Sequence, residues 1–257
     1  MKKKFILKFI QFFSYFYYTK TRKYFFILVI RKFKKFLFKE NSKNKKKWIK
    51  ENLISHKTFY KINKIKYSNF FLKQKKYFIQ AKKKYDLLAV KMGGMADLNL
   101  IYNITKKNKP QNILETGVAF GWSTLAFSLS KKKNTKIFSI DLPYPFKNSH
   151  NYIAKALPVN LKKNIRFFFG IDTEILNQLY YKKKKFDIIH YDSDKSFEAR
   201  KKNYEIIWKM LRKNGYFISD DISDNTAFEQ FIKKFKIKNF YILQCDGKFV
   251  GVASKNS

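Results

Sequence analysis

Residues 113–123 read Ile-Leu-Glu-Thr-Gly-Val-Ala-Phe-Gly-Trp-Ser, and the fold follows from this stretch. Its apolar start predicts a buried strand, and a helix is expected from Ser123 onward. The glycines at 117 and 121 predict a tight turn between them, because glycine adopts backbone conformations that other residues avoid and lets a ligand approach closely. Two glycines alone are typical of any tight strand-to-helix turn, so the function of this turn has to be inferred from the neighbouring segments.

The rest of the chain from Leu87 alternates short apolar runs with helix-like stretches, which predicts a parallel sheet covered by helices. Strands are expected at 112–116, 136–141, 165–170, 186–192 and 216–220. Helices are expected at 123–130, 152–156, 174–180, 197–211 and 226–235. Two last strands, 240–244 and 249–253, flank Asp246-Gly247, a pair typical of a hairpin turn. The predicted sheet therefore ends on an antiparallel hairpin.

Acidic residues follow four of the predicted strands. Asp141 ends the second strand about 20 residues after the glycine turn, where a carboxylate can accept the hydroxyls of a ribose. Asp172 follows the third strand and could equally cap the next helix. Asp192, Asp194, Asp220 and Asp221 follow the next two strands. Neighbouring parallel strands end side by side, so these carboxylates are expected to converge.

This order of motifs resembles class I S-adenosylmethionine-dependent methyltransferases over roughly residues 90–254. The resemblance implies a doubly wound α/β, Rossmann-like sheet of seven strands with the antiparallel C-terminal hairpin. It also implies S-adenosylmethionine as the cofactor. The cofactor-binding candidates are Glu115, Gly117, Gly121, Ser123, Asp141 and Asp172.

The acidic strand ends also resemble bacterial metal-dependent O-methyltransferases. That resemblance makes Asp192, Asp220 and Asp221 candidate ligands of a divalent metal such as Mg²⁺. Crowded carboxylates repel one another unless they are protonated, paired with cations or bridged by a metal, and of these three solutions a hard cation such as Mg²⁺ is the preferred explanation. Asp192 or His190 is the candidate proton acceptor. Lys195 stands where the related pattern Asp-Ser-Asp-His has its histidine.

The net charge of +39 is unevenly distributed. Residues 1–85 carry 27 Lys and Arg against two acids, whereas 86–257 carry 30 against 16. We therefore divide the chain into a basic, aromatic, helical extension (1–85) and a methyltransferase domain (86–257). Residues 1–50 would suit contact with an anionic membrane or another polyanion. AT-rich codons would produce the same enrichment in Lys, Phe, Ile, Asn and Tyr without any function.

The expected reaction is O-methylation of a hydroxylated small molecule, with a saccharide as a family-level suggestion. The alternative is a protein that binds nucleic acid or a membrane surface through its basic part and uses the α/β core as a scaffold. No apolar run reaches membrane-spanning length. With one cysteine, Cys245, the chain can form no internal disulfide. A cytoplasmic location is expected, with peripheral membrane contact as an alternative.

Overall fold

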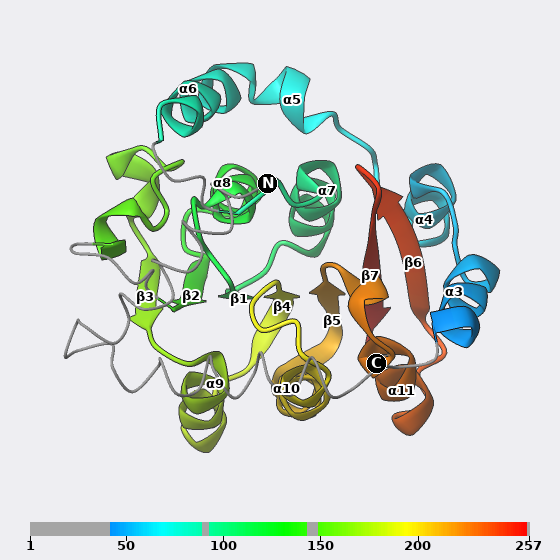
Figure 1. Cartoon of the computed structure of the whole chain (residues 1–257). Coiled ribbons are helices and arrows are strands. Elements are labelled where there is room, and N and C mark those ends of the chain that lie inside the picture. Colours follow the sequence, from blue (N-terminus) through cyan, green and yellow to red (C-terminus); the bar gives the residue numbers. More distant parts are fainter. Residues whose placement is uncertain (1–41, 89–92, 143–148, 256–257) are drawn as a thin grey trace, which may run out of the picture.

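The computed structural model describes residues 42–88, 93–142 and 149–255, with side chains from Lys47 onward. In this part of the chain, seven strands form one sheet in the order β3-β2-β1-β4-β5-β7-β6 (Figure 1). The strands are β1 (Asn112–Thr116), β2 (Lys136–Asp141), β3 (Ile165–Phe169), β4 (Phe186–Tyr191), β5 (Leu211–Ser219), β6 (Phe240–Cys245) and β7 (Lys248–Ser254). The predicted fold class is confirmed.

Strands β1 to β5 are parallel, and β7 pairs antiparallel with both β5 and β6. The glycine turn follows β1 at the centre of the sheet, where the strand order reverses direction. Such a reversal opens a crevice at the carboxyl ends of the strands, and ligands of open α/β sheets bind there. The predicted hairpin is also confirmed, and Asp246 and Gly247 form its turn with positive φ angles of 48° and 75°.

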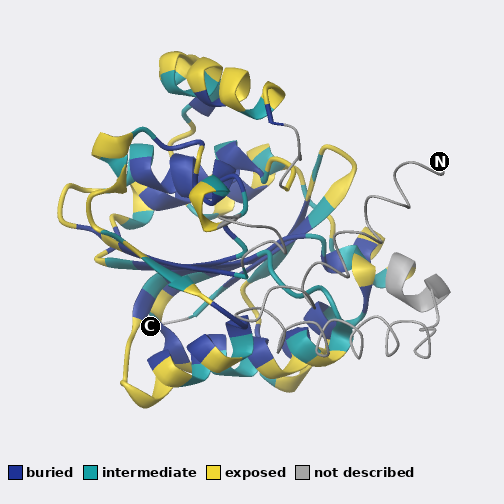
Figure 2. Cartoon of the chain, turned by 60° about the vertical axis from the view of Figure 1, so that its left-hand side comes forward, coloured by how far each residue is buried: buried dark blue, intermediate teal, exposed yellow. Residues whose placement is uncertain are grey.

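Helices cover both faces of the sheet (Figures 1 and 2). One face carries α7 (Leu98–Asn108) and α8 (Trp122–Ser130). The other carries α9 (Asp172–Tyr181), α10 (Phe197–Met210) and α11 (Ala227–Lys234). Figure 2 shows the sheet as a buried layer between them, because strands covered on both faces bury side chains on both. The short 3₁₀ helices are η1 (Ser149–Tyr152), η2 (Val159–Lys162) and η3 (Ile222–Asp224).

Two predicted elements were wrong in part. Residues 152–156 form no α-helix: after η1 the chain makes turns, and Ala154 and Ala156 donate backbone hydrogen bonds to Ala119 and Phe120 in the glycine turn. Tertiary hydrogen bonds to that turn replace the bonds a helix would make. Strand β5 begins at Leu211, directly after α10 and five residues before the predicted start.

The N-terminal region contributes helices α3 (Ser42–Glu51), α4 (His56–Ile62), α5 (Phe70–Lys73) and α6 (Lys75–Asp86). Phe59, Phe70 and Ala81 are fully buried and share a hydrophobic cluster with the core of the sheet. The chain also joins the edge of the sheet, where Ile54 N donates to Ile242 O at 2.9 Å. Helix α6 ends next to the predicted boundary at 85, but the division into domains stays a prediction.

Most of the basic, aromatic segment proposed to contact a membrane or polyanion, residues 1–41, lies outside the described residues. Within the described ranges, no helix combines the length and the apolar composition needed to cross a bilayer.

Candidate active site

The glycine turn lies at the carboxyl edge of the sheet and has an unusual backbone. Gly117, Ala119 and Gly121 have φ angles of 82°, 47° and 95°. A Cβ at position 117 would lie 2.2 Å from the carbonyl oxygen of Asp192. The turn therefore packs directly against the loop after β4, and only glycine fits at 117.

Asp141, at the end of β2, is held against this turn. Its carboxylate accepts hydrogen bonds from the Ala119 N–H at 2.7 Å and from its neighbour Leu142 at 2.8 Å. Burial raises the pKa of Asp141 to about 7, against the lowering effect of these two bonds. The structure thus brings the predicted ribose acceptor and the glycine turn together. The carboxylate is buried yet retains acceptor capacity for further donors.

Glu115 and Ser123 are placed differently from what their predicted role suggests. The Glu115 carboxylate is fully buried and accepts hydrogen bonds from the hydroxyls of Ser123, Thr124 (2.7 Å) and Ser139 (3.0 Å). These bonds connect β1 to α8 and β2 inside the protein. Cofactor binding by Glu115 and Ser123 stays a prediction that this geometry does not support.

Asp172 is the first residue of α9 and is also buried. Its Oδ2 accepts hydrogen bonds from the hydroxyls of Ser193 (2.6 Å) and Tyr191 (3.2 Å) and from the Asn203 amide (3.2 Å). It therefore fixes the loop after β4. Its predicted place near the adenine remains a prediction.

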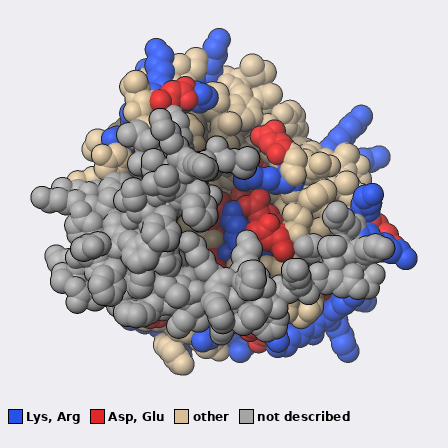
Figure 3. Space-filling model, viewed as in Figure 1, with Lys and Arg blue, Asp and Glu red and all other residues tan. Residues whose placement is uncertain are grey.

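Asp192 and Asp221 are bridged by Lys195. The Lys195 ammonium forms ion pairs with Asp192 Oδ1 at 3.1 Å and with Asp221 Oδ2, and Lys248 lies 3.7 Å from Asp221 Oδ1. Figure 3 shows acidic and basic side chains next to one another in a hollow at the centre of this face. The carboxylates at the ends of β4 and β5 therefore lie close together, as predicted, and they form ion pairs with lysine side chains.

His190 and Asp220 form a second pair behind this one. The fully buried His190 Nε2 lies 3.3 Å from Asp220 Oδ2. Burial lowers the pKa of His190, but the charges of Asp220, Glu115 and Asp192 outweigh it and raise that pKa to about 9. This environment favours the protonated imidazole, which cannot accept a further proton. Its predicted role as a base stays a prediction without geometric support.

Asp192 is better suited to proton transfer. Burial and the nearby Asp220 raise its pKa to about 6, and Lys195 and His190 limit that rise. At neutral pH it is a carboxylate with a higher proton affinity than an exposed aspartate. A base works best when its pKa is close to the working pH.

The predicted divalent metal fits this arrangement poorly. Within the described ranges, no three His, Cys, Asp or Glu side chains are grouped as metal ligands. Lys195 bridges Asp192 and Asp221, and Asp220 is paired with His190. The three carboxylates are already balanced by Lys195, Lys248 and the charged His190, so a metal would have to displace Lys195. A metal held by these residues stays a prediction.

Arg200 is a contributor that the sequence prediction missed. It is fully buried, and its guanidinium donates to the backbone carbonyls of Asp220 at 3.0 Å and Asp221 at 2.9 Å. It thereby fixes the end of β5. The signal was present in the spacing of Arg200, Asn203, Tyr204 and Ile207, which are buried on one face of α10.

Comparisons with known proteins agree with this geometry. Residues 114–222 match a family described as a methyltransferase domain. A methyltransferase domain is thus recognised in residues 114–222. The match spans the glycine turn, Asp141, Asp172, Asp192, Asp220 and Asp221, and the predicted class I S-adenosylmethionine-dependent methyltransferase is confirmed in fold and enzyme class. A search of curated proteins finds no match.

Solved structures share the fold of this methyltransferase. An O-methyltransferase from Bacillus cereus in complex with SAH has a TM-score of 0.56 at 16% identity, covering 70% of this chain and 90% of the other. A methyltransferase from Geobacter sulfurreducens gives 0.56 at 16%, covering 70% and 88%. The O-methyltransferase TomG from Streptomyces achromogenes, in complex with SAM, gives 0.54 at 15%, covering 75% and 92%. At such identities the likeness concerns the fold, and nothing in these comparisons supports the alternative of a core that is only a scaffold.

Proposed function

We propose that the chain transfers a methyl group from S-adenosylmethionine to a hydroxyl oxygen of a small molecule. The observation that carries the proposal is the meeting of three features at one edge of the sheet. These are the left-handed glycine turn, the Asp141 carboxylate that accepts from Ala119, and the partly exposed pair of Asp192 and Lys195. The turn and Asp141 suit the cofactor, and the pair suits the acceptor.

The cofactor supplies a methyl group on a positively charged sulfur. The turn at Gly117 and Gly121 would hold its amino acid part, and the Asp141 carboxylate would accept the ribose hydroxyls. Binding and alignment by these groups are a large part of catalysis, because they replace a chance encounter by a fixed geometry. The cationic sulfur would also be favoured by the carboxylates of this edge.

Asp192 is our proposed proton acceptor. The acceptor oxygen attacks the methyl carbon, the carbon–sulfur bond breaks as the carbon–oxygen bond forms, and the hydroxyl proton passes to Asp192. Lys195 keeps Asp192 in place at 3.1 Å and can donate a hydrogen bond to the acceptor. This mechanism uses only groups of the chain. In this mechanism the repulsion between the crowded carboxylates is relieved by pairing with a cation, Lys195.

Oxygen is favoured over nitrogen as the acceptor atom. The described fold neighbours include O-methyltransferases, and the Asn/Asp-Pro-Pro-Tyr sequence typical of amine methylation is absent from the chain. The proposal of a hydroxylated acceptor rests on this argument, and a saccharide is one example of such a molecule.

The test combines binding and turnover with the full-length chain. Titration calorimetry with S-adenosylmethionine should show one binding site, and incubation with labelled cofactor and a small-molecule extract should yield labelled, base-stable ethers. Asp192→Asn should lower turnover by about 100-fold or more and leave cofactor affinity close to that of the wild type. No cofactor binding by the wild-type chain would overturn the proposal.

A further inference from the structure

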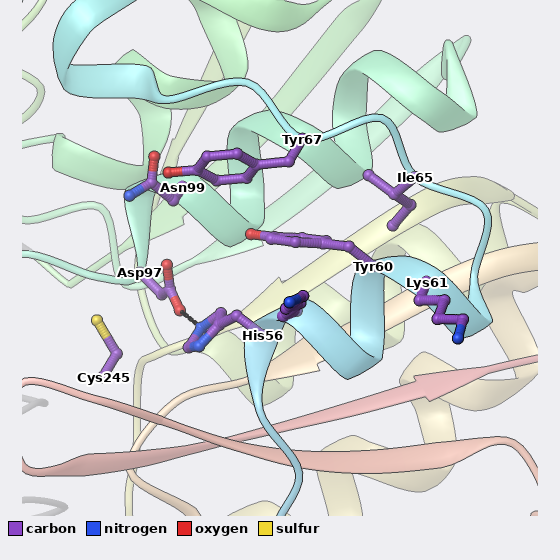
Figure 4. A pocket seen from close by; sticks show the side chains of 9 residues that line it. His56, Tyr60, Lys61, Ile65, Tyr67, Asp97, Asn99 and Cys245 are labelled. Atoms are coloured by element: carbon purple, nitrogen blue, oxygen red, sulfur yellow. Dashed lines mark hydrogen bonds and ion pairs between the residues drawn. The ribbon is translucent and has the colours of Figure 1, made fainter.

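A cavity of about 510 Å³ opens between α4, the start of α7 and the end of β6 (Figure 4). The proposed mechanism makes no use of it. Its lining includes His56, Tyr60, Lys61, Tyr67, Asp97 and Cys245. These residues come from three separate parts of the sequence, and the N-terminal region supplies most of them.

The cavity lies at the same edge of the sheet as the active site. Strand β6 runs in the same direction as β5, because both pair antiparallel with β7, so Cys245 at its end lies on the carboxyl edge. Burial and the carboxylates of Asp97, Asp246 and Asp220 raise the pKa of Cys245 to about 12. The Cys245 thiol thus lies within electrostatic reach of Asp97 in the cavity wall and of Asp220 in the acidic cluster, which consists of Asp192, Asp220 and Asp221.

The segment before α7 connects the two places. A Cβ on Gly93 would lie 3.0 Å from the side chain of Ala119 in the glycine turn. One on Gly94 would lie 3.8 Å from Lys248 Nζ, which is paired with Asp221. Three residues later the chain reaches Asp97 in the cavity wall. This segment thus passes the glycine turn and Lys248 before it reaches the cavity wall.

The cavity contains polar groups that suit a hydroxylated ligand. His56 Nε2 lies 2.5 Å from Asp97 Oδ2, and the buried Asp97 is fixed by the Leu100 N–H at 3.0 Å. The buried Tyr60 hydroxyl makes no hydrogen bond of acceptable geometry within the described ranges. In Figure 4 this hydroxyl points toward the side of the cavity where Asp97 and Asn99 lie. The polar neighbour of the Tyr60 hydroxyl is the Asn103 side chain. A hydroxyl both donates and accepts, so it retains capacity for a hydrogen bond to a polar ligand.

The walls indicate what else the ligand carries. The rings of Tyr60 and Tyr67 lie 5.4 Å apart and are tilted by 32°, and Tyr67 is half exposed. Such rings bind the flat face of another ring. Lys57 and Lys61, both exposed, also line this cavity, and their positive charges favour a ligand with a negative charge.

We propose that this cavity binds the methyl acceptor, a hydroxylated ring compound with a negative charge, and that His56 and Tyr60 hold its polar groups. The inference rests on the proposed function, since it names the acceptor of that same site. The acceptor's ring would lie on Tyr67, with its charge at Lys57 and Lys61 and its reacting hydroxyl toward Asp192.

The first experiment fills the cavity. Cys245→Trp in the full-length chain places a large ring in the cavity. Ile62→Trp, on the exposed face of α4 outside the cavity, controls for an added tryptophan. Cofactor binding is measured by calorimetry, and transfer is measured as labelled product from the fraction of a small-molecule extract that an anion exchanger retains.

We expect Cys245→Trp and Ile62→Trp to bind S-adenosylmethionine as the wild type does. Cys245→Trp should lose product formation by at least about 10-fold, and Ile62→Trp should keep it. Unchanged transfer by Cys245→Trp, or labelled product confined to the unretained fraction, would overturn the inference and leave the proposed function intact. A wild-type chain that binds no cofactor would instead overturn the proposed function and the inference with it.

The second experiment separates binding from chemistry. His56→Phe keeps a ring and removes the hydrogen bonds, and His56→Gln retains a donor and an acceptor. We expect KM for the purified acceptor to rise roughly 10- to 100-fold in His56→Phe with little change in kcat, and partial recovery in His56→Gln. The double variant Lys57→Met with Lys61→Met, both exposed, should raise KM without affecting folding. Equal kcat and KM in all variants and the wild type would contradict a role for this wall.

Discussion

The two halves of the active-site edge are built by different means. On the cofactor side, the ends of β1 and β2 are shaped by the backbone: a left-handed glycine turn and one carboxylate that accepts from that turn. On the acceptor side, the ends of β4, β5 and β6 are shaped by long side chains, namely Lys195, Lys248 and Arg200, which come from loops, a helix and the hairpin. A nearly fixed cofactor permits a short local motif, whereas a particular acceptor requires contacts from many places.

The comparison also explains why similar acids differ in role. Glu115 is the last but one residue of β1 and Asp141 is the last residue of the neighbouring β2. Glu115 is enclosed by three hydroxyl donors, whereas Asp141 borders the turn. Glu115 lies in register with Ser139, two residues before Asp141, so the two carboxylates lie on the same face of the sheet and differ in how far along the strands they lie. The deeper Glu115 is enclosed in the core, whereas Asp141 lies nearer the carboxyl edge.

The largest effect should come from Gly117→Ala, which would distort both the glycine turn and the loop after β4. The new Cβ would lie 2.2 Å from the Asp192 carbonyl oxygen at a φ of 82°, so the turn and the β4 loop would have to separate. We expect a loss of about 3 kcal/mol or more in unfolding free energy, measured by urea denaturation. Gly247→Ala is the control, with a φ of 75° and open space around it, and should cost only about 1 kcal/mol. Equal costs would contradict close contact between the halves.

The next effect concerns Asp141 and the cofactor side alone. Asp141→Ala should weaken S-adenosylmethionine binding by about 100-fold, because two hydrogen bonds to a charged acceptor are lost. Ribose donors favour the ionised carboxylate, so the bound pKa should fall below about 7. Wild-type affinity should then rise as pH increases toward 7 and level off above it. In Asp141→Asn this rise of affinity with pH should be absent. If the variant kept the pH profile of the wild type, the result would argue against ribose binding by Asp141.

Glu115→Ala should affect stability instead of binding. Its removal leaves the hydroxyls of Ser123, Thr124 and Ser139 without their shared acceptor and creates a cavity, at a cost of about 2–4 kcal/mol in thermal or urea unfolding. Glu115→Gln keeps the volume and should cost less. Cofactor affinity of the folded variants should stay near the wild-type value. A loss of affinity as large as that in Asp141→Ala would instead support the predicted place of Glu115 at the cofactor.

The smallest effect concerns whether Lys195 or a divalent metal balances the charge of the carboxylates. Wild-type turnover should persist in EDTA, because Lys195 pairs with both Asp192 and Asp221. In Lys195→Ala the two carboxylates lose this cation, and added Mg²⁺ should raise Tm by about 2–4 °C while leaving the wild type unchanged. Loss of wild-type turnover in EDTA, restored by Mg²⁺, would instead support the predicted metal at Asp192, Asp220 and Asp221.

Much of the fold could be predicted because its signals are local. Apolar runs gave the strands, Gly117 and Gly121 marked the turn, and Asp246-Gly247 marked the hairpin that separates this fold from other nucleotide-binding sheets. The prediction failed at residues 152–156, where bonds to the glycine turn outweighed helix formation. The placement of Glu115 and Ser123 at the cofactor stays a prediction. Sequence order could not show that the Glu115 carboxylate accepts hydrogen bonds from the hydroxyls of Ser123, Thr124 and Ser139.

The sequence by itself determined the sheet, its turn and the acids at its carboxyl edge, because periodicity and turn chemistry act over a few residues. Only the tertiary structure decided which cations accompany those acids, since Lys195 and Lys248 lie 53 positions apart in the chain and meet at Asp221. The same holds for His56 and Asp97, which carry no motif and become a pair 2.5 Å apart when α4 packs beside α7. Contacts between distant segments depend on packing, and packing is a property of the whole chain.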